Sequence, residues 1–244
     1  MTLTAQHLDL AGRLGGVSLT LQPGAVTAIC GPNGAGKSSL LTCLAGLLAP
    51  DAGEVRLAGA PLLGLPPRQR ACAIGYLPQQ AELAWDLSVE TLAGLGRLPW
   101  RSGAEADRAA VAAALAALDL DALRTRPLSQ LSGGEQARAL LARVLAGEPQ
   151  WLLADEPLAA LDLAHQLALL GQFRRLAQQG AGVVLVLHDL TQAMNHADRV
   201  VVLDRGRIVA DGPPQQALDA AVIEQVWQVR ARWLGEPGQR ALAT

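Results

Sequence analysis

The stretch GPNGAGKS, Gly31–Ser38, constrains the fold of this chain more than any other feature. It follows a short apolar run, Val26–Cys30, and leads into a leucine-rich run that begins at Lys37. Glycine costs roughly 0.5–1 kcal/mol relative to alanine inside regular structure, so the cluster marks a tight turn between a strand and a helix. A buried strand joined to a helix in this way predicts an α/β fold.

The spacing of this stretch fits G-x-x-x-x-G-K-[ST], in the strand-turn-helix context that the motif requires. Backbone N–H groups at such a turn and helix start point together at phosphate oxygens. We expect Lys37 to reach the β- and γ-phosphates and the Ser38 hydroxyl to bind Mg²⁺. A plain turn explains the glycines but not a lysine and a serine at these offsets. The predicted phosphate-binding residues are Gly31, Pro32, Asn33, Gly34, Ala35, Gly36, Lys37, Ser38 and Ser39.

The remaining apolar pattern predicts a parallel sheet. Three runs, Trp151–Asp155, Val183–His188 and Arg199–Asp204, alternate with helical patterns such as that of 163–179. Short apolar strands that alternate with helices indicate a sheet covered on both faces. We also expect a hairpin in LDRGRIVADG, which begins at Leu203.

Three other segments complete the predicted domain. The run EVRLAG, from Glu54, predicts a strand of a small antiparallel element. Between about 86 and 130 valines thin out and alanines accumulate, which predicts an inserted helical subdomain. The segment 214–233 predicts a helix. We therefore expect one α/β domain over 1–244, a P-loop NTPase core with a mostly parallel sheet.

Composition excludes several classes of protein. The net charge is −2 and no basic block occurs, which argues against a nucleic-acid partner. Three cysteines without a paired spacing indicate a reducing compartment. No signal peptide is predicted at the start of the chain, and the most apolar run, Ala109–Leu118, is far short of the ~20 residues that span a bilayer. We expect a cytoplasmic protein, so any membrane role must come through a partner.

Two further motifs carry chemistry. In WLLADE, a strand ends at Asp155, whose carboxylate can hold Mg²⁺, and Glu156 follows, where it can orient or deprotonate water. Taken alone, this acidic pair is equally compatible with two solvated side chains. In LSGGEQ, Leu131–Gln136, a serine and two glycines precede a helix and form a second anion-binding helix start. An N-cap serine on a glycine turn explains that hexapeptide when it is taken alone.

These motifs occur in the order Gly31–Ser38, LSGGEQ and LLADEP, with His188 after a later strand. Together they resemble the nucleotide-binding subunit of ATP-binding-cassette (ABC) transporters, over essentially the whole chain. The resemblance implies an ATPase whose two copies form a head-to-tail dimer with two ATP molecules between them. It also implies a membrane permease as partner, and indirectly a periplasmic or surface substrate-binding protein, with the chain at the cytoplasmic face of the membrane.

The resemblance assigns roles to individual residues. Catalysis is assigned to Glu156, Gln79 and His188, where Gln79 in YLPQQ is preferred over Gln80. Mg²⁺ is assigned to Ser38, Gln79 and Asp155. ATP bound by the other copy is assigned to Ser132, Gly133, Gly134 and Gln136, and the dimer interface to Asp162.

Two departures from the family pattern stand out. Ala159 occupies a position that usually carries Ser, Thr or Asn, so a polar contact across the dimer is missing. No aromatic residue precedes Tyr76, although the family usually stacks adenine on a ring upstream of the phosphate loop. Adenine is therefore expected to meet aliphatic side chains or the Arg13 guanidinium.

The cargo follows from resemblance alone. LDLAHQ, Leu161–Gln166, and LSVETLAGLGRLPW, Leu87–Trp100, resemble subunits that energise import of iron–siderophore complexes, haem or vitamin B12. A helix start explains DLAHQ equally simply. Rival interpretations are a soluble ABC ATPase that acts as a scaffold for iron–sulfur cluster assembly, and an importer of another small solute. A DNA-repair ABC ATPase needs a long coiled-coil insertion, and a simple P-loop kinase has no use for LSGGEQ.

Overall fold

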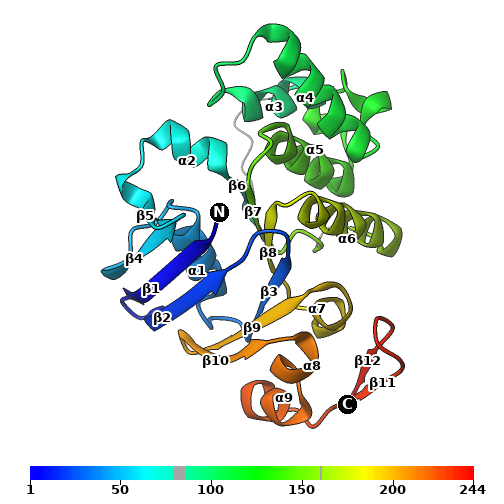
Figure 1. Ribbon diagram of the computed structural model, residues 1–244. Helices are drawn as coiled ribbons and strands as arrows, with labels where there is room; N and C mark the ends of the chain where they lie inside the picture. The colour runs from blue at the N-terminus through cyan, green and yellow to red at the C-terminus, as the bar shows by residue number, and fades with distance from the viewer. Residues whose placement is uncertain (80–85, 160) are drawn as a thin grey trace.

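A six-stranded sheet forms the centre of the molecule (Figure 1). The computed structural model describes residues 1–79, 86–159 and 161–244. In space the strands follow the order β10-β9-β3-β8-β7-β6, and only β10 runs antiparallel to its neighbour. Their bounds are β3 (Val26–Cys30), β6 (Ile74–Leu77), β7 (Trp151–Asp155), β8 (Gly182–Val186), β9 (Arg199–Asp204) and β10 (Arg207–Gly212). The parallel sheet and the closing hairpin β9–β10 are confirmed.

Both faces of this sheet are buried, because alternate side chains of each strand point to opposite sides. On β8, Val183 and Leu185 belong to one apolar cluster, whereas Val184 and Val186 belong to the other. The first cluster is covered mainly by helices, and the second by α1 and a separate antiparallel sheet. The helices are α1 (Lys37–Leu44), α2 (Pro67–Ala73), α5 (Gly133–Ala146), α6 (Leu163–Gln178), α7 (Leu190–His196), α8 (Pro214–Ala217) and α9 (Ala220–Trp227).

The antiparallel sheet contains the expected strand at Glu54 and also the first residues of the chain. Its order is β2-β1-β4-β5, with β1 (Leu3–Leu10), β2 (Leu14–Leu21), β4 (Ala52–Leu57) and β5 (Ala60–Pro61). Sequence patterns had assigned no element to 3–21. The β1–β2 register shifts between Ala5 and Leu8, and His7 has a φ of 49°, so a bulge interrupts the strict alternation that a strand shows in sequence.

A group of helices lies at one end of the central sheet, at the top of Figure 1. It contains α3 (Val89–Gly94), α4 (Ala104–Ala117) and the short 3₁₀ turns η2 (Leu95–Arg97), η3 (Asp121–Leu123) and η4 (Leu128–Gln130). Helices α3 and α4 pack on α5. The spacing of Val111, Leu115 and Leu118 predicts one apolar helical stripe, and all three side chains are buried. The helical character predicted for this insert is confirmed.

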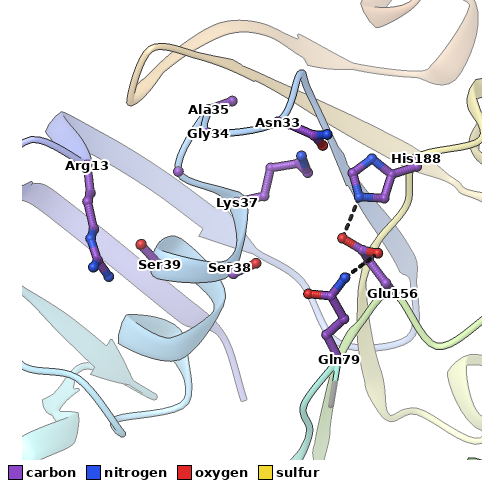
Figure 2. Close-up of a pocket in the computed structure, with 11 residues that line it drawn as sticks. Arg13, Asn33, Gly34, Ala35, Lys37, Ser38, Ser39, Gln79, Glu156 and His188 are labelled. Carbon is purple, nitrogen blue, oxygen red and sulfur yellow. Dashed lines mark hydrogen bonds and ion pairs between the residues drawn. The ribbon is translucent and has the colours of Figure 1, made fainter. Parts of the chain in front are cut away.

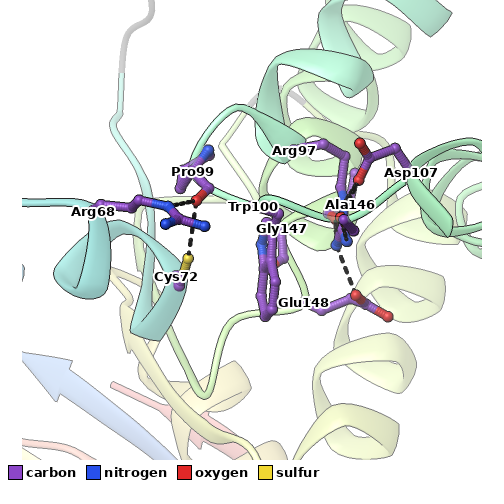
Figure 3. A network of polar contacts seen from close by, with 10 residues as sticks. Arg68, Cys72, Arg97, Pro99, Trp100, Asp107, Ala146, Gly147 and Glu148 are labelled. Carbon is purple, nitrogen blue, oxygen red and sulfur yellow. Dashed lines mark hydrogen bonds and ion pairs between the residues drawn. The ribbon is translucent and has the colours of Figure 1, made fainter. Parts of the chain in front are cut away.

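Polar contacts join this helical group to the rest of the domain (Figure 3). The buried Arg97 guanidinium pairs with Asp107 at 2.9 Å and Glu148 at 2.7 Å, and it donates to the Ala146 carbonyl at 2.9 Å. Two residues further along the chain, the Pro99 carbonyl accepts hydrogen bonds from Arg68 and Cys72 of α2. A buried, paired cation of this kind fixes geometry more than it adds stability.

Two helix predictions need correction. The leucine spacing after the phosphate loop predicts a helix with Leu40, Leu44 and Leu47 on one face, but α1 ends at Leu44. Leu40 and Leu44 are buried, whereas Leu47 is 64% exposed. The segment 214–233, predicted as one helix, instead forms two, α8 and α9, which are separated at Leu218 and Asp219, and it is not helical beyond Trp227. There Gln228 adopts a left-handed conformation that ends α9, and β11 (Arg232–Leu234) pairs with β12 (Ala241–Ala243).

The chain in its described part offers no helix that combines the length and the apolar character needed to cross a membrane.

Candidate functional site

The phosphate loop connects β3 to α1 at the carboxyl edge of the central sheet (Figure 2). Gly34 and Gly36 have φ angles of 79° and 99°, which side-chain-bearing residues rarely adopt. A Cβ atom at Gly36 would lie 2.5 Å from the backbone oxygen of Arg13. The loop therefore needs glycine here both for its conformation and for its close approach to the β1–β2 connection.

Lys37 is held inside this loop. Its ammonium group donates hydrogen bonds to the carbonyl oxygens of Gly31 and Pro32, both at 2.9 Å, and the residue is 7% exposed. Burial lowers the pKa of Lys37, and the nearby carboxylate of Glu156 opposes this effect. The lysine thus forms a positive charge at the floor of the loop, opposite the acidic strand ends.

Asp155 is a buried carboxylate whose hydrogen bonding is incomplete. It is 3% exposed at the end of β7, and within the described residues its Oδ1 atom has no hydrogen-bond partner. Burial, and to a smaller degree the charge of Glu156, raises the pKa of Asp155, while the Ser38 hydroxyl and Lys37 act in the opposite direction. An orphaned carboxylate oxygen beside a serine hydroxyl fits a hard cation such as Mg²⁺.

Glu156 is held at both of its carboxylate oxygens (Figure 2). The Gln79 amide donates to Oε2 at 2.7 Å, and His188 Nε2 contacts Oε1. Glu156 itself has a φ of 50°, a conformation that non-glycine residues rarely adopt and that proteins retain mainly at functional sites. The side chain is thereby aimed across the phosphate loop instead of outward into solvent.

The order of the strands explains why these three residues meet. Gln79 follows β6, Glu156 follows β7 and His188 follows β8, and these strands are neighbours in the sheet. The phosphate loop follows β3, which lies beside β8. The carboxyl ends of adjacent parallel strands form a common edge, which is where ligands bind in α/β sheets.

A cavity of about 630 Å³ opens at this edge, within the range of small-ligand sites. Its lining consists of Arg13, Asn33, Gly34, Ala35, Gly36, Lys37, Ser38, Ser39, Gln79, Glu156 and His188. Arg13 stands on the side of the phosphate loop away from Glu156 (Figure 2). The cavity therefore brings together Asn33–Ser39 of the phosphate loop with Gln79, Glu156 and His188. Of the other predicted residues, Gly31, Pro32 and Asp155 are described by the structure but are not part of this lining, and Gln80 lies outside the described residues.

The LSGGEQ segment begins a different helix. Ser132 caps α5: its hydroxyl accepts the Glu135 N–H at 3.3 Å, and the Glu135 carboxylate accepts the Ser132 N–H at 2.7 Å. The Ser132 backbone N–H and the Ser132 hydroxyl both donate to the Glu135 carboxylate and lower its pKa. Within the described residues, the predicted trans residues Ser132, Gly133, Gly134 and Gln136 do not line the cavity.

Asp162 caps α6 in the same manner, and its carboxylate accepts the His165 N–H at 2.9 Å. Ala159, where a polar residue is usual, is exposed. Gln166, which sequence analysis named only as the end of LDLAHQ, and Gln192, which it did not name, line a second cavity of about 140 Å³ together with Glu156 and His188. The spacing from Leu158 to Gln166 repeats that from Leu128 to Gln136, a signal that could have identified Gln166.

The fold and the cavity together define a phosphate-loop nucleotide-binding domain. A family model described as ABC transporter matches residues 14–159, more than half of the chain, and the chain belongs to this family. The resemblance predicted from the three motifs is confirmed, and with it the assignment as an ATPase.

Relatives agree with this assignment. Proteins from Myxococcus xanthus and Streptomyces coelicolor, both named hemin import ATP-binding protein HmuV, are 47% and 44% identical over 237 and 240 residues. The first alignment covers 92% of this chain and 89% of the relative, and the second covers 97% and 86%.

Solved structures show the same fold. A transporter described as a metal-chelate type ABC transporter in an inward-facing conformation superposes with a TM-score of 0.83 at 25% identity, covering 99% of this chain and 95% of that chain. A dimeric ATP-binding cassette in a post-hydrolysis state, bound to ADP and phosphate, has a TM-score of 0.80 at 27% identity and covers 87% and 98%.

Proposed function

We propose that this chain is the ATP-hydrolysing subunit of a membrane importer for haem or a closely related metal chelate. The observation that carries the hydrolytic part is the Glu156 carboxylate, which Gln79 and His188 hold across the phosphate loop from Lys37. The relatives named as hemin importers support the cargo, and their names favour import over a scaffold for iron–sulfur assembly.

Each predicted residue has a role in this proposal. The loop N–H groups and Lys37 bind the phosphates, which neutralises charge on the transferring phosphoryl group. Ser38, Asp155 and Gln79 hold Mg²⁺, which when bound supplies further positive charge to the phosphate oxygens. The orphaned Oδ1 atom of Asp155 supports this ligand set.

Glu156 acts as the general base that orients and deprotonates water. Gln79 and His188 each make one contact with this carboxylate, and an ionised carboxylate can accept further hydrogen bonds, so a water molecule can bind beside them. Gln79 therefore connects the state of the catalytic carboxylate to the segment that follows β6.

The second half of each ATP site comes from another copy of the chain. Ser132, Gly133, Gly134 and Gln136 lie at the start of α5, outside the cavity lined by the phosphate loop, with Ser132 and Gly133 exposed and Gly134 and Gln136 half-buried. We propose that they contact ATP across a head-to-tail homodimer, with Asp162 at the interface. The dimeric cassette of the same fold supports this arrangement.

The dimer binds permease subunits at the cytoplasmic face of the membrane, and a periplasmic or surface substrate-binding protein delivers the cargo to them. We assign no nucleic-acid partner, since the net charge of −2 gives no electrostatic footprint for phosphate backbones.

The variant Glu156→Gln tests the hydrolytic assignment. It should retain ATP affinity, lose at least about 100-fold in ATPase rate, and accumulate as an ATP-bound dimer in gel filtration, because a general base contributes roughly 10²–10⁴-fold. Glu105→Gln, an exposed carboxylate in the first turn of α4, is the matched control and should hydrolyse ATP at the parent rate. Parental turnover by Glu156→Gln would exclude Glu156 as the base.

The cargo is tested separately in cells. A strain that lacks this chain should fail to grow with haem as the only iron source, and the restored gene should rescue growth. Normal haem use, in a strain without a second ATPase of this type, would refute the cargo and leave the ATPase assignment standing. Co-purification with a multi-span membrane protein separates the importer from a soluble scaffold.

A further inference from the structure

Two segments that lead into helices share one nine-residue sequence pattern. Residues 128–136 read LSQLSGGEQ and residues 158–166 read LAALDLAHQ. Each has leucine at its first and fourth positions, a helix-capping residue at the fifth and glutamine at the ninth. We call these segments the Ser132 turn and the Asp162 turn. Both carry residues proposed to meet a second copy of the chain.

In each turn the glutamine joins the two ends. The Gln166 amide nitrogen donates to the carbonyl oxygens of Leu158 and Leu161, both at 3.1 Å. The Gln136 amide nitrogen donates to Leu128 at 3.0 Å and Leu131 at 3.3 Å. One amide thus uses its two N–H groups to satisfy two turn carbonyls.

The direction of each capping side chain is also fixed from the helix that follows. Asp162 Oδ1 lies 2.8 Å from His165 Nδ1 and accepts the His165 backbone N–H as well. The Ser132 hydroxyl likewise contacts the Glu135 carboxylate at 2.9 Å and accepts the Glu135 backbone N–H at 3.3 Å. The contacts with His165 therefore fix the direction of the Asp162 side chain, and the hydrogen bonds from Gln166 fix the path of the backbone that carries it.

Gln166 has one further contact, which leads towards the catalytic residues. Its amide oxygen accepts a hydrogen bond of 3.5 Å from the amide of Gln192, on the first turns of α7. Helix α7 starts directly after His188, and the cavity of about 140 Å³ lies among Glu156, His188 and these two glutamines. The Asp162 turn is therefore connected to the turn that carries His188 in the same copy.

We propose that Gln166 is a positioning residue of the dimeric ATPase, which holds the Asp162 turn in the shape that meets the second copy and couples that turn to His188. This inference rests on the proposed function, because it takes the ATP-dependent dimer as given. The same hydrogen bonds at Gln136 show that the chain uses this device in the other turn as well, and they assign Gln136 a role within its own chain.

The experiment compares variants in the Glu156→Gln background, in which the ATP-bound dimer accumulates. Gln166→Met keeps the length of the side chain and removes both N–H donors, and Gln166→Glu keeps an acceptor for Gln192 without a donor. Gln172→Met is the matched control. Its amide also donates from α6 to a carbonyl, that of Ala117 at 2.6 Å, but at neither turn. Sedimentation in the presence of ATP and Mg²⁺ gives the dissociation constant (Kd) of the dimer. ATP titration at protein concentrations below that Kd gives the ATP affinity of the single subunit.

Both Gln166 variants should raise the dimer Kd about tenfold over the Gln172→Met control, a change of about 1.4 kcal/mol. The ATP affinity of the single subunit should match the control, since the phosphate loop is complete within one chain. A merely structural role would lower the melting temperature of all three variants and leave the dimer Kd unchanged, which would overturn the inference. A Glu156→Gln protein that stays monomeric with ATP would instead remove the proposed dimer, and this inference with it.

Discussion

Replacing Gly133 by alanine separates what one chain needs from what the dimer needs. Gly133 is the first residue of α5, directly after the capping Ser132. Its φ angle is not in the positive range that favours glycine, and a Cβ atom at this position would have no neighbouring atom within 4 Å. Within one copy of the chain, alanine therefore fits this position without strain.

The expected effect on stability is a gain. Alanine restricts the unfolded chain more than glycine does, which is worth roughly 0.5–1 kcal/mol at a compatible helical position. For a domain of this size, the melting temperature should rise by roughly 1–4 °C. Gly171→Ala, within α6 and also without an atom within 4 Å, should give the same gain and is the matched control.

The expected effect on activity is a loss. In the proposed dimer the open space at Gly133 is occupied by the ATP of the other copy, and a methyl group there displaces it. Small misplacements of reacting groups cost up to about 10²-fold in rate, so we expect Gly133→Ala to lose at least about tenfold in ATPase rate. Gly171→Ala should hydrolyse ATP like the parent.

Thermal unfolding without nucleotide and steady-state ATP hydrolysis measure the two effects. A more stable Gly133→Ala variant with parental activity would refute a nucleotide facing this glycine. A less stable variant would refute the local interpretation of the glycine itself.

Two further predictions concern the cavity. Asp155→Asn should stabilise the nucleotide-free protein by about 1–2 kcal/mol at pH 8, because it removes a buried negative charge that is incompletely hydrogen-bonded. Because the pKa of Asp155 is raised in the folded chain above its ordinary value of 3.8, protonation of Asp155 favours folding at pH values below 3.8, and this stabilisation is lost as the pH rises through the folded pKa. The gain from Asp155→Asn should therefore vanish near pH 4 in thermal unfolding. An equal gain at pH 4 and pH 8 would contradict this. Arg13→Tyr should tighten ATP and GTP binding alike by roughly tenfold in titration calorimetry, since every base offers a face for stacking; unchanged affinity for both would exclude a base at Arg13.

The sequence predicts best those elements whose structure depends on a few consecutive residues. The phosphate loop lies between one strand and the helix that follows it, so offsets from Gly31 to Ser38 were sufficient. The helix starts at Ser132 and Asp162 are equally local, because each cap accepts a hydrogen bond from an N–H group three residues further on.

The predictions made from the sequence were wrong where packing between distant segments overrides a local pattern. Nothing in the composition of α9 requires it to stop at Trp227, but Trp233 donates its indole N–H to the Leu218 carbonyl at 2.7 Å, which places it on a returning strand. At the other end of the chain, the bulge at His7 moves the buried positions of β1 out of simple alternation. The end of α9 and the bulge in β1 both depend on contacts between segments that are distant in the sequence, which a local pattern does not report.

The sequence by itself determined that this chain binds phosphate and that it carries a carboxylate pair after a buried strand. Only the tertiary structure decided that Gln79, Glu156 and His188 meet, because β6, β7 and β8 are neighbours in the sheet although long segments separate them in the chain. It likewise decided that Asp155 has an oxygen without a partner and that Gln166 joins the two ends of its turn. Strand order and side-chain pairing arise from packing of the whole domain, which no short stretch of residues encodes.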